Sequence, residues 1–315
     1  MNHDDMLIAE VANMYYNLHY SQDQIAEELF LSRSKVSRMI QKGIDLGIVE
    51  IKINLPNKRC SDLEETLKNK FHLRDCHVLE TGEHFGFDQI CNYAAKYIDS
   101  YIRDNIIVGV SSGKTVHNVC SKLDFKLVNN LTFSQVKGSA GIGAEYIYDS
   151  PNLILALSNK FSSNFNLIYS PLYVFNEEVR DYLMNELIIV NALKIAKKAD
   201  LLISSLGVPA YDNSRIYTEY LKTSYMKNIF EKKPVASYIG HFFDRNGNAL
   251  DSKIEKSIIG LSIEDIKKIN KRIVVVYGEE KSEALETILK AGFINILIVD
   301  EKCVKKLIYR SKTLL

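Results

Sequence analysis

Short apolar segments alternate with helical patterns from about residue 76 to the end of the 315-residue chain. The expected strands span 77–79, 106–111, 132–137, 167–170, 201–206, 236–239, 272–277 and 296–299. The expected helices span 88–103, 115–123, 177–198, 214–231, 262–269, 281–291 and 301–309. Apolar strands separated by helices predict an α/β fold, with a doubly wound, mainly parallel sheet covered on both faces. Ligands bind such sheets at the carboxyl ends of the strands, so functional residues are expected in those loops.

The N-terminal region has a different pattern, which is typical of a helix-turn-helix. Ser21 is expected to cap a first short helix, and Gln24 to complete its capping box. Ser32 is expected to cap a second helix, and an amphipathic helix over 4–18 to pack behind the pair. The expected packing positions of the three helices are Met6, Ile8, Ala9, Ala12, Tyr16, Ile25, Ala26, Leu29, Val36, Met39, Ile40 and Ile44.

The polar side of the second helix carries hydrogen-bond donors and no carboxylate. Residues 1–56 contain five Lys/Arg and eight Asp/Glu, yet four of the five cations lie between Arg33 and Lys42, where no acid occurs. An ordinary helical hairpin would mix charges of both signs on its solvated face, whereas a recognition helix needs donors for bases and phosphates. We therefore predict that double-stranded DNA is contacted by Ser21, Gln22, Ser32, Arg33, Ser34, Lys35, Ser37 and Arg38.

The domain boundary is expected near Pro56. Residues 48–54 alternate apolar and polar residues and predict a wing strand after a turn at Gly47, in which Lys52 is either a phosphate contact or a solvated lysine. Pro56 and the following residues predict a linker, and a helix over 62–71 is expected to open the second domain. The sequence thus predicts a DNA-binding domain over 1–56 and a larger ligand-binding and oligomerisation domain over 57–315.

Composition excludes several other classes. A hydrophobic content of 46% and a charged content of 25% are those of a globular protein with a real core. No signal peptide pattern or membrane-spanning run is present, so we expect a cytoplasmic protein without a membrane partner. Five scattered cysteines without a C-x-x-C pair predict reduced thiols rather than disulfides or zinc, and the histidines lack metal-ligand spacing. We expect no metal and no cofactor.

Two strand-end loops carry residues that suit an anionic, reactive ligand. The first runs from an apolar strand through Ser111, Gly113, Lys114 and Thr115 into a helix, where small residues, hydroxyls and the helix N-terminus favour a phosphate. The earlier glycine of a nucleotide P-loop is missing, so a smaller phosphate ester fits better. A plain strand-to-helix turn is the alternative.

In the second loop, Lys137 ends an apolar strand just before Gly138. A desolvated lysine there would have a lowered pKa, and its neutral amine could form a Schiff base with an aldehyde. A cationic contact to phosphate and a surface lysine remain alternatives.

The sequence also resembles a known family. The pattern YY-x(4)-SQ-x-x-IAEEL-x-LSRS-x-VSR-x-I, followed by LGIVEIKI, resembles the N-terminal region of SorC-family bacterial transcriptional regulators. The matching residues are Tyr15, Tyr16, Ser21, Gln22, Ile25, Ala26, Leu29, Ser32, Arg33, Val36, Ser37, Arg38, Gly47, Ile48 and Val49. Members join such a head to a sugar-phosphate-binding domain. The resemblance continues over nearly the whole chain.

The resemblance implies further effector-binding residues. The 111–115 segment is similar to the family's phosphate loop, and Lys281 falls where a cation would meet the same phosphate. Gly207 would wall the pocket, and Asp244 would accept hydrogen bonds from sugar hydroxyls, although it is also an ordinary turn residue. The strand–Lys–Gly form at Lys137 is most similar to the family's deoxyribonucleoside regulators, which implies an imine with deoxyribose 5-phosphate.

These observations predict a transcriptional regulator rather than an enzyme. We expect a homo-oligomer, dimer or tetramer, that acts as a repressor on operator DNA and is controlled by a sugar phosphate. The alternatives are a non-covalent sensor of another sugar phosphate, and a sugar-phosphate isomerase or aldolase. Proton transfer at carbon requires an acid–base pair, and the sequence places none beside Lys137, so it favours a sensor over an isomerase or aldolase. An adaptor that binds protein through the same head would lack salt-dependent DNA affinity.

Overall fold

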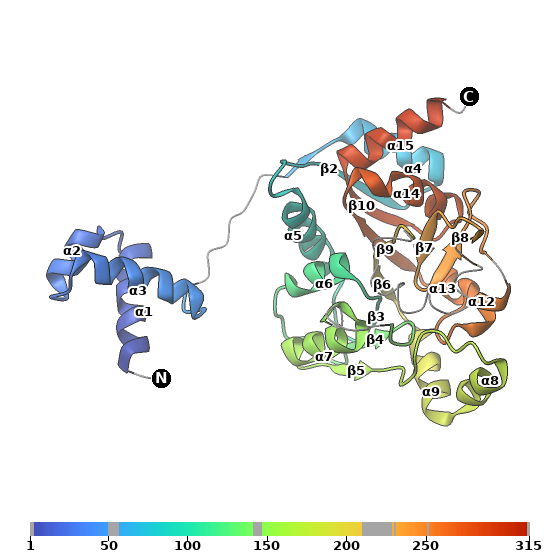
Figure 1. Ribbon diagram of the computed structural model, residues 1–315, viewed down its shortest axis with the longest axis horizontal. Coiled ribbons are helices and arrows are strands. Elements are labelled where there is room, and N and C mark those ends of the chain that lie inside the picture. Colours follow the sequence, from blue (N-terminus) through green and yellow to red (C-terminus); the bar gives the residue numbers. More distant parts are fainter. Residues whose placement is uncertain are drawn as a thin grey trace. The chain divides into compact units, whose positions relative to one another are not determined.

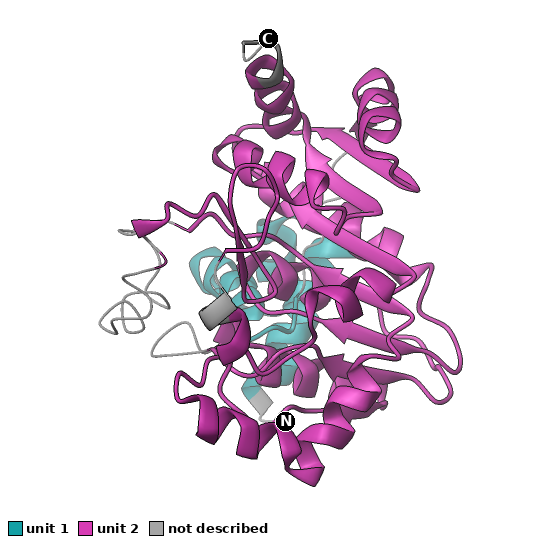
Figure 2. Ribbon diagram, turned by 90° about the vertical axis from the view of Figure 1, so that its right-hand side faces the viewer, with its two compact units in different colours: residues 1–56 teal, residues 57–315 magenta. Residues whose placement is uncertain are grey.

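The computed structural model describes residues 3–49, 57–140, 147–209, 229, 231–250 and 252–313. Two compact units divide the chain, residues 1–56 and 57–315 (Figure 2). The expected wing strand over 48–54 and the expected helix over 214–231 lie almost wholly outside the described residues. Within the described part, no helix is long and apolar enough to cross a membrane.

The smaller unit consists of α1 (His3–Tyr16), α2 (Gln22–Glu28) and α3 (Arg33–Asp45). Its core is apolar and takes one face of each helix: Ile8, Val11, Met14, Ile25, Val36, Met39 and Ile40. Two expected core positions are wrong, because Met6 is 63% exposed and Ile44 is 36% exposed. The buried stripe of α3 continues through Gly43 instead, where an added Cβ would already lie 3.4 Å from both Ile8 and Val49.

Both predicted helix caps are present. The Ser21 hydroxyl accepts from the Gln24 amide at 3.3 Å, and the Gln24 side chain accepts from the Ser21 amide at 2.9 Å, which is a complete capping box. The Ser32 hydroxyl accepts from the Lys35 amide at 3.3 Å and so begins α3. Between the helices, Phe30 has φ of 53° and a 96% exposed side chain. This left-handed residue makes the tight turn of the helix-turn-helix.

The larger unit is built on an eight-stranded sheet with the order β1-β2-β10-β9-β6-β3-β4-β5 (Figure 1). Its strands are β1 (Lys58–Arg59), β2 (Asp75–Glu80), β3 (Ile107–Val110), β4 (Thr132–Gln135), β5 (Asn164–Asn166), β6 (Leu201–Ser204), β9 (Lys271–Val276) and β10 (Ile296–Asp300). All neighbours are parallel except β1, which pairs antiparallel with β2. A separate antiparallel pair is formed by β7 (Ala236–Tyr238) and β8 (His241–Phe243).

Helices cover both faces of this sheet, as the strand pattern predicted. One face packs on α5 (Gly86–Asp99), α6 (Lys114–Ser121) and α7 (Ser150–Phe161). The other face packs on α4 (Ser61–Phe71), α9 (Leu187–Ala196), α13 (Ile263–Lys268), α14 (Ser282–Lys290) and α15 (Glu301–Thr313). The remaining described helices are α8 (Glu177–Asn185), α12 (Ser252–Ser257) and the short 3₁₀ helix η2 (Glu279–Lys281). Neighbouring residues such as Val274 and Val275 point to opposite cores, so the doubly wound α/β prediction is confirmed.

Several element predictions were wrong. The expected linker after Pro56 contains β1, and the expected strand over 167–170 is replaced by β5 three residues earlier. The long helix expected over 177–198 is broken into α8 and α9, and α7, α12 and β8 were not predicted. The expected strand over 236–239 does form, but as β7 of the small sheet rather than as part of the large one.

The order of the strands places a switch point between β3 and β6. From β3, the chain adds β4 and β5 on one side of the sheet and then returns to add β6, β9 and β10 on the other. The loops that follow β3 and β6 therefore leave the sheet in opposite directions and open a crevice between them. In open α/β sheets this crevice is the usual ligand-binding position.

Candidate functional site

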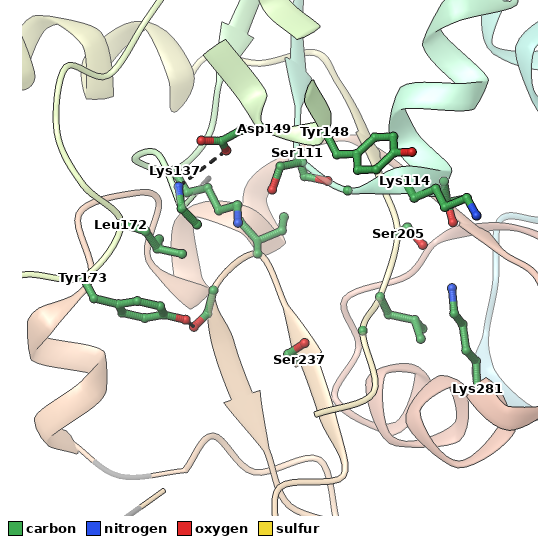
Figure 3. A pocket seen from close by; sticks show the side chains of 18 residues that line it. Ser111, Lys114, Lys137, Tyr148, Asp149, Leu172, Tyr173, Ser205, Ser237 and Lys281 are labelled. Atoms are coloured by element: carbon green, nitrogen blue, oxygen red, sulfur yellow. Dashed lines mark hydrogen bonds between the residues drawn. The ribbon is translucent and has the colours of Figure 1, made fainter. Parts of the chain in front are cut away.

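A cavity of about 320 Å³ lies at these strand ends. Its walls come from the loops after β3, β4 and β6, the turn between β7 and β8, and η2, together with residues that precede α7 and α8 (Figure 3). The cavity brings together seven of the nine predicted effector residues: Ser111, Gly113, Lys114, Thr115, Lys137, Gly207 and Lys281. Its volume falls at the small end of the range for metabolite sites.

The loop between β3 and α6 has the geometry of an anion cradle. Gly113 has φ of 121° and ψ of 160°, a conformation that only glycine adopts readily, and it begins α6 without a side-chain cap. Its amide donates to the Tyr148 carbonyl at 2.9 Å. The amides of the first turn of α6, beginning at Lys114 and Thr115, have no acceptor within the helix. The loop therefore offers donors and a helix dipole to a phosphate.

Lys137 is a buried amine at the wall of the cavity. It follows β4, forms an antiparallel bridge with Gly260 and is only 8% exposed. Burial lowers the pKa of its ammonium group, and the Coulombic effect of the Asp149 carboxylate partly opposes this shift. Asp149 is itself buried, and it accepts hydrogen bonds from the Ser139 hydroxyl and, at 2.8 Å, from the Ser150 amide. The amine can therefore lose its proton more easily than an ordinary lysine.

Two further lysines lie away from Lys137 within the cavity. Lys281 ends η2 and is half-buried, and desolvation lowers the pKa of its ammonium group against the opposing charge of Glu280. The Lys114 ammonium lies 5.7 Å from the centre of the Phe87 ring. In Figure 3, Lys114 and Lys281 lie on one side of the cavity and Lys137 on the other, with Ser111 and Ser205 between them. The cavity thus has two cationic ends with different surroundings.

Two predicted effector residues do not line the cavity. A Cβ on Gly138 would lie 2.6 Å from the Pro171 carbonyl oxygen, so this glycine permits close backbone packing. The Asp244 carboxylate accepts from the amides of Asn246 at 2.8 Å and Asn248 at 2.9 Å, and these bonds help lower its pKa. Asp244 is therefore placed as a turn residue, which was the alternative given for it.

The cavity also contains residues that the sequence analysis missed. They are Ala140, Tyr148, Asp149, Leu172, Tyr173, Ser205, Leu206, Ser237, Ile239 and Gly240, whereas Ser112 lines the cavity as part of the predicted 111–115 loop. Asp149 had a readable signal, because an Asp followed by Ser-Pro is a typical helix start and Asp149 is indeed the N-cap of α7. Ser205 could have been found as a polar residue at the end of an apolar strand. The residues around Leu172 and Tyr173 lack any comparable signal.

The smaller unit places the predicted DNA-binding residues on its surface. Ser32, Arg33, Ser34, Lys35, Ser37 and Arg38 are all exposed on or beside α3. The Arg38 guanidinium donates to the Ser34 carbonyl at 3.3 Å, and Arg33 lies 3.5 Å from the Asp23 carboxylate. Ser21 is exposed and Gln22 partly buried at the start of α2. The arrangement matches a helix that presents cations and hydroxyls to a charged partner.

Comparison with known proteins identifies the family. Residues 56–309 match the family model Sugar-bind, described as a sugar-binding domain. The chain belongs to the SorC family. The deoxyribonucleoside regulator of Bacillus subtilis strain 168 is 27% identical over 305 residues, which cover 96% of this chain and 97% of that protein. Transcriptional regulator LsrR of Escherichia coli K12 is 28% identical over 303 residues, covering 93% and 92% of the two chains.

Solved structures of SorC-type regulators share the fold. The full-length sorbitol operon regulator SorC from Klebsiella pneumoniae has a TM-score of 0.73 and 22% identity, covering 97% of this chain and 99% of that chain. A transcriptional regulator from Streptococcus pneumoniae TIGR4 has a TM-score of 0.75 and 23% identity, covering 80% and 97%. The relatives of this chain are therefore transcriptional regulators with a sugar-binding domain.

Proposed function

We propose that this SorC-family member is a repressor whose affinity for operator DNA is controlled by a sugar phosphate in the cavity described above. The ligand proposed is deoxyribose 5-phosphate, bound as a Schiff base on Lys137. One observation carries this proposal: a buried amine with a lowered pKa lies across the same cavity from a helix N-terminus and two lysines. An aldehyde that also bears a phosphate has the two groups that such a cavity can hold.

The chemistry needs only the ligand and the amine. The neutral amine of Lys137 attacks the aldehyde carbon, and a carbon–nitrogen bond forms. The former carbonyl oxygen then leaves as water, carrying both protons of the amine, and a neutral imine remains. Asp149 is buried and its carboxylate acts electrostatically on Lys137, so it would stabilise positive charge on the nitrogen during these transfers. The phosphate stays ionised and is held by the helix-start end of the 111–115 loop, residues 113–115, with Lys281.

Control of DNA binding requires that the ligand favour one arrangement of subunits. We propose that two or four chains associate through the larger unit and present paired α3 helices to repeated half-sites. A ligand that favours an arrangement with misplaced helices would weaken operator binding. A coupling of about 1–3 kcal/mol would change the affinity by about 5- to 150-fold. No turnover is required, so the proposal is a sensor and not an enzyme.

Reductive trapping tests the covalent step. The full chain is incubated with deoxyribose 5-phosphate and borohydride, digested, and its peptides are mapped by mass spectrometry. We expect Lys137 to gain the mass of the sugar phosphate less one oxygen atom, because hydride reduces the imine to a secondary amine. Lys137→Arg keeps the positive charge and should give no adduct, whereas Lys281→Met should still give the adduct at saturating ligand. Saturable binding without an adduct on Lys137 would leave a non-covalent sensor.

The pH dependence of trapping provides a second test. Burial lowers the pKa of Lys137 below the ordinary lysine value of 10.5, so its neutral form is populated at lower pH than that of a surface lysine. The rate of adduct formation should therefore rise with pH and level off below the range in which surface lysines titrate. A rate that keeps rising through the ordinary lysine range would contradict a desolvated amine. If the sugar phosphate is recovered altered after release, the protein is an enzyme instead.

A further inference from the structure

Two serine hydroxyls in the cavity lack hydrogen-bond partners. The Oγ atoms of Ser111 and Ser205 are buried, and neither has a partner within the described part of the chain. Both residues line the cavity, and Ser111 is only 3% exposed. Leaving a buried hydroxyl unpaired is unfavourable, so native proteins usually satisfy such groups. Two such hydroxyls in one cavity indicate that a ligand provides their partners.

The strand order sets where these hydroxyls lie. Neighbouring positions in the sheet are β9, β6, β3 and β4, and these strands lead to Lys281, Ser205, Ser111 and Lys137 respectively. The Ser111 amide donates to the Ile203 carbonyl at 3.0 Å, and Val110 pairs with Ile203, so Ser205 lies one residue beyond the position opposite Ser111 on the adjacent strand. The cavity therefore offers, in order, an ammonium, a hydroxyl, a hydroxyl and an ammonium. Figure 3 shows the same sequence of side chains across the site.

From this order we infer that Ser111 and Ser205 are specificity residues that bind the two middle hydroxyls of an extended, open-chain sugar phosphate. The inference rests on the proposed function and adds which atoms of the ligand are recognised. With the aldehyde carbon at Lys137 and the phosphate near Lys281 and Lys114, the hydroxyl nearer the aldehyde meets Ser111. The hydroxyl nearer the phosphate meets Ser205.

Hydroxyls suit these positions better than charged or apolar groups. A serine hydroxyl both donates and accepts, as does a sugar hydroxyl, so each pair can satisfy both groups. No carboxylate other than that of Asp149 lines the described cavity, and the apolar side chain of Leu172 lies beside Lys137 (Figure 3). The carbon next to the aldehyde therefore meets an apolar surface, which favours a 2-deoxy sugar. A ligand without the two middle hydroxyls would leave both serines unpaired.

The test compares two ligands that differ only in those hydroxyls. Deoxyribose 5-phosphate and 5-oxopentyl phosphate share the aldehyde, the phosphate and the chain length, but the second has no hydroxyl group. Dissociation constants are measured by calorimetry for the wild-type chain, Ser111→Ala, Ser205→Ala and the double variant. We expect the wild type to prefer the sugar, and each single substitution to reduce that preference on the order of 10-fold without weakening the unsubstituted aldehyde.

Matched variants separate recognition from structure. Ser112→Ala removes a serine of the phosphate loop whose hydroxyl is not among the unpaired ones, so any loss of affinity should be the same for both ligands, which share the phosphate, and the preference ratio should not change. Ser111→Ala and Ser205→Ala remove hydroxyls without partners, so the thermal midpoint of the ligand-free protein should not fall. Equal losses for both ligands, or an unchanged ratio in the serine variants, would overturn the inference while leaving the sensor intact. If neither ligand binds the wild type, the proposed function itself fails.

Discussion

Replacing Gly113 with alanine tests whether the loop of residues 111–115 holds the anionic end of the ligand. Gly113 has φ of 121° and ψ of 160°, and a residue with a Cβ held there is strained by on the order of 1–3 kcal/mol. No atom lies within 4 Å of the Cβ that alanine would add, so the substitution introduces backbone strain without a clash. We expect the free protein to relieve this strain by rotating the loop, which loses the 2.9 Å bond to the Tyr148 carbonyl.

The size of the effect follows from that strain. Binding would have to restore the wild-type loop conformation, so about 1–3 kcal/mol would be lost from the affinity for a phosphate ligand. This loss corresponds to about 5- to 150-fold weaker binding. Any strain that remains in the free protein would lower its thermal midpoint by about 2–4 °C per kcal/mol for a unit of this size.

Calorimetry with deoxyribose 5-phosphate and with inorganic phosphate measures the affinity, and thermal unfolding measures the strain. Gly82→Ala is the matched control, because Gly82 is exposed, has no positive φ and also has nothing within 4 Å of an added Cβ. The reasoning is refuted if Gly113→Ala binds both ligands as tightly as Gly82→Ala does. In that case the first turn of α6 would not contact the phosphate.

Three further substitutions, with Lys58→Ala as a control, test the two units. Arg59→Ala should lower the free energy of unfolding of the larger unit by about 2 kcal/mol, measured by urea unfolding. The substitution removes the 2.7 and 2.8 Å hydrogen bonds that the Arg59 guanidinium donates to the buried Glu64 carboxylate. The Arg59 side chain is 42% exposed, and solvent screening reduces the effect. Lys58→Ala, which breaks only an exposed pair, should change nothing measurable. Ser32→Ala should destabilise the smaller unit by about 1 kcal/mol in a circular dichroism melt, because it removes the cap of α3. Arg38→Ala should weaken DNA binding and reduce its salt slope by about 1, with sugar-phosphate affinity unchanged.

Each of these tests has an outcome that counts against it. Equal stability of the Arg59→Ala and Lys58→Ala variants would mean that the Glu64 carboxylate finds another partner. An unchanged melt for Ser32→Ala would mean that packing alone sets the start of α3. Equal loss of DNA and ligand affinity in Arg38→Ala would contradict the assignment of the two functions to separate units.

Local patterns predicted the elements whose stabilising contacts are close in sequence. The capping box at Ser21 and the cap at Ser32 depend on groups three residues away, and both formed as expected. Most strands of the large sheet were also found, because buried parallel strands are continuous apolar runs. Because ligands bind at the carboxyl ends of parallel strands, the predicted strand ends also predicted Lys137 and the 111–115 loop as site residues.

The errors occur where distant contacts decide the structure. Lys58 and Arg59 have the composition of a polar linker, yet they form a strand that pairs with Glu80 and Leu79 of β2. The residues around them do not predict this pairing. The edge strand β5 is only three residues long and two of them are asparagine, so its bounds could not be predicted from hydrophobic periodicity. Asp244 matched a family pattern, but the amides of Asn246 and Asn248, within four residues of it, satisfy its carboxylate. The sequence shows Ser205 as a polar residue at the end of an apolar strand, but not that its hydroxyl is buried and unpaired.

The pairing of β2 with β10 has a consequence for synthesis of the protein. β2 has β10 as its parallel neighbour, so residues 75–80 cannot enter the sheet until residues 296–300 have been made. The 3.0 Å hydrogen bond from the Thr81 amide to the Glu301 carboxylate also cannot form until residue 301 has been made. The helices of residues 3–45, by contrast, are complete when the ribosome has released the first part of the chain. A product truncated before residue 296 would therefore keep a folded N-terminal unit but lack β10, the strand that joins β2 to the rest of the ligand-binding sheet.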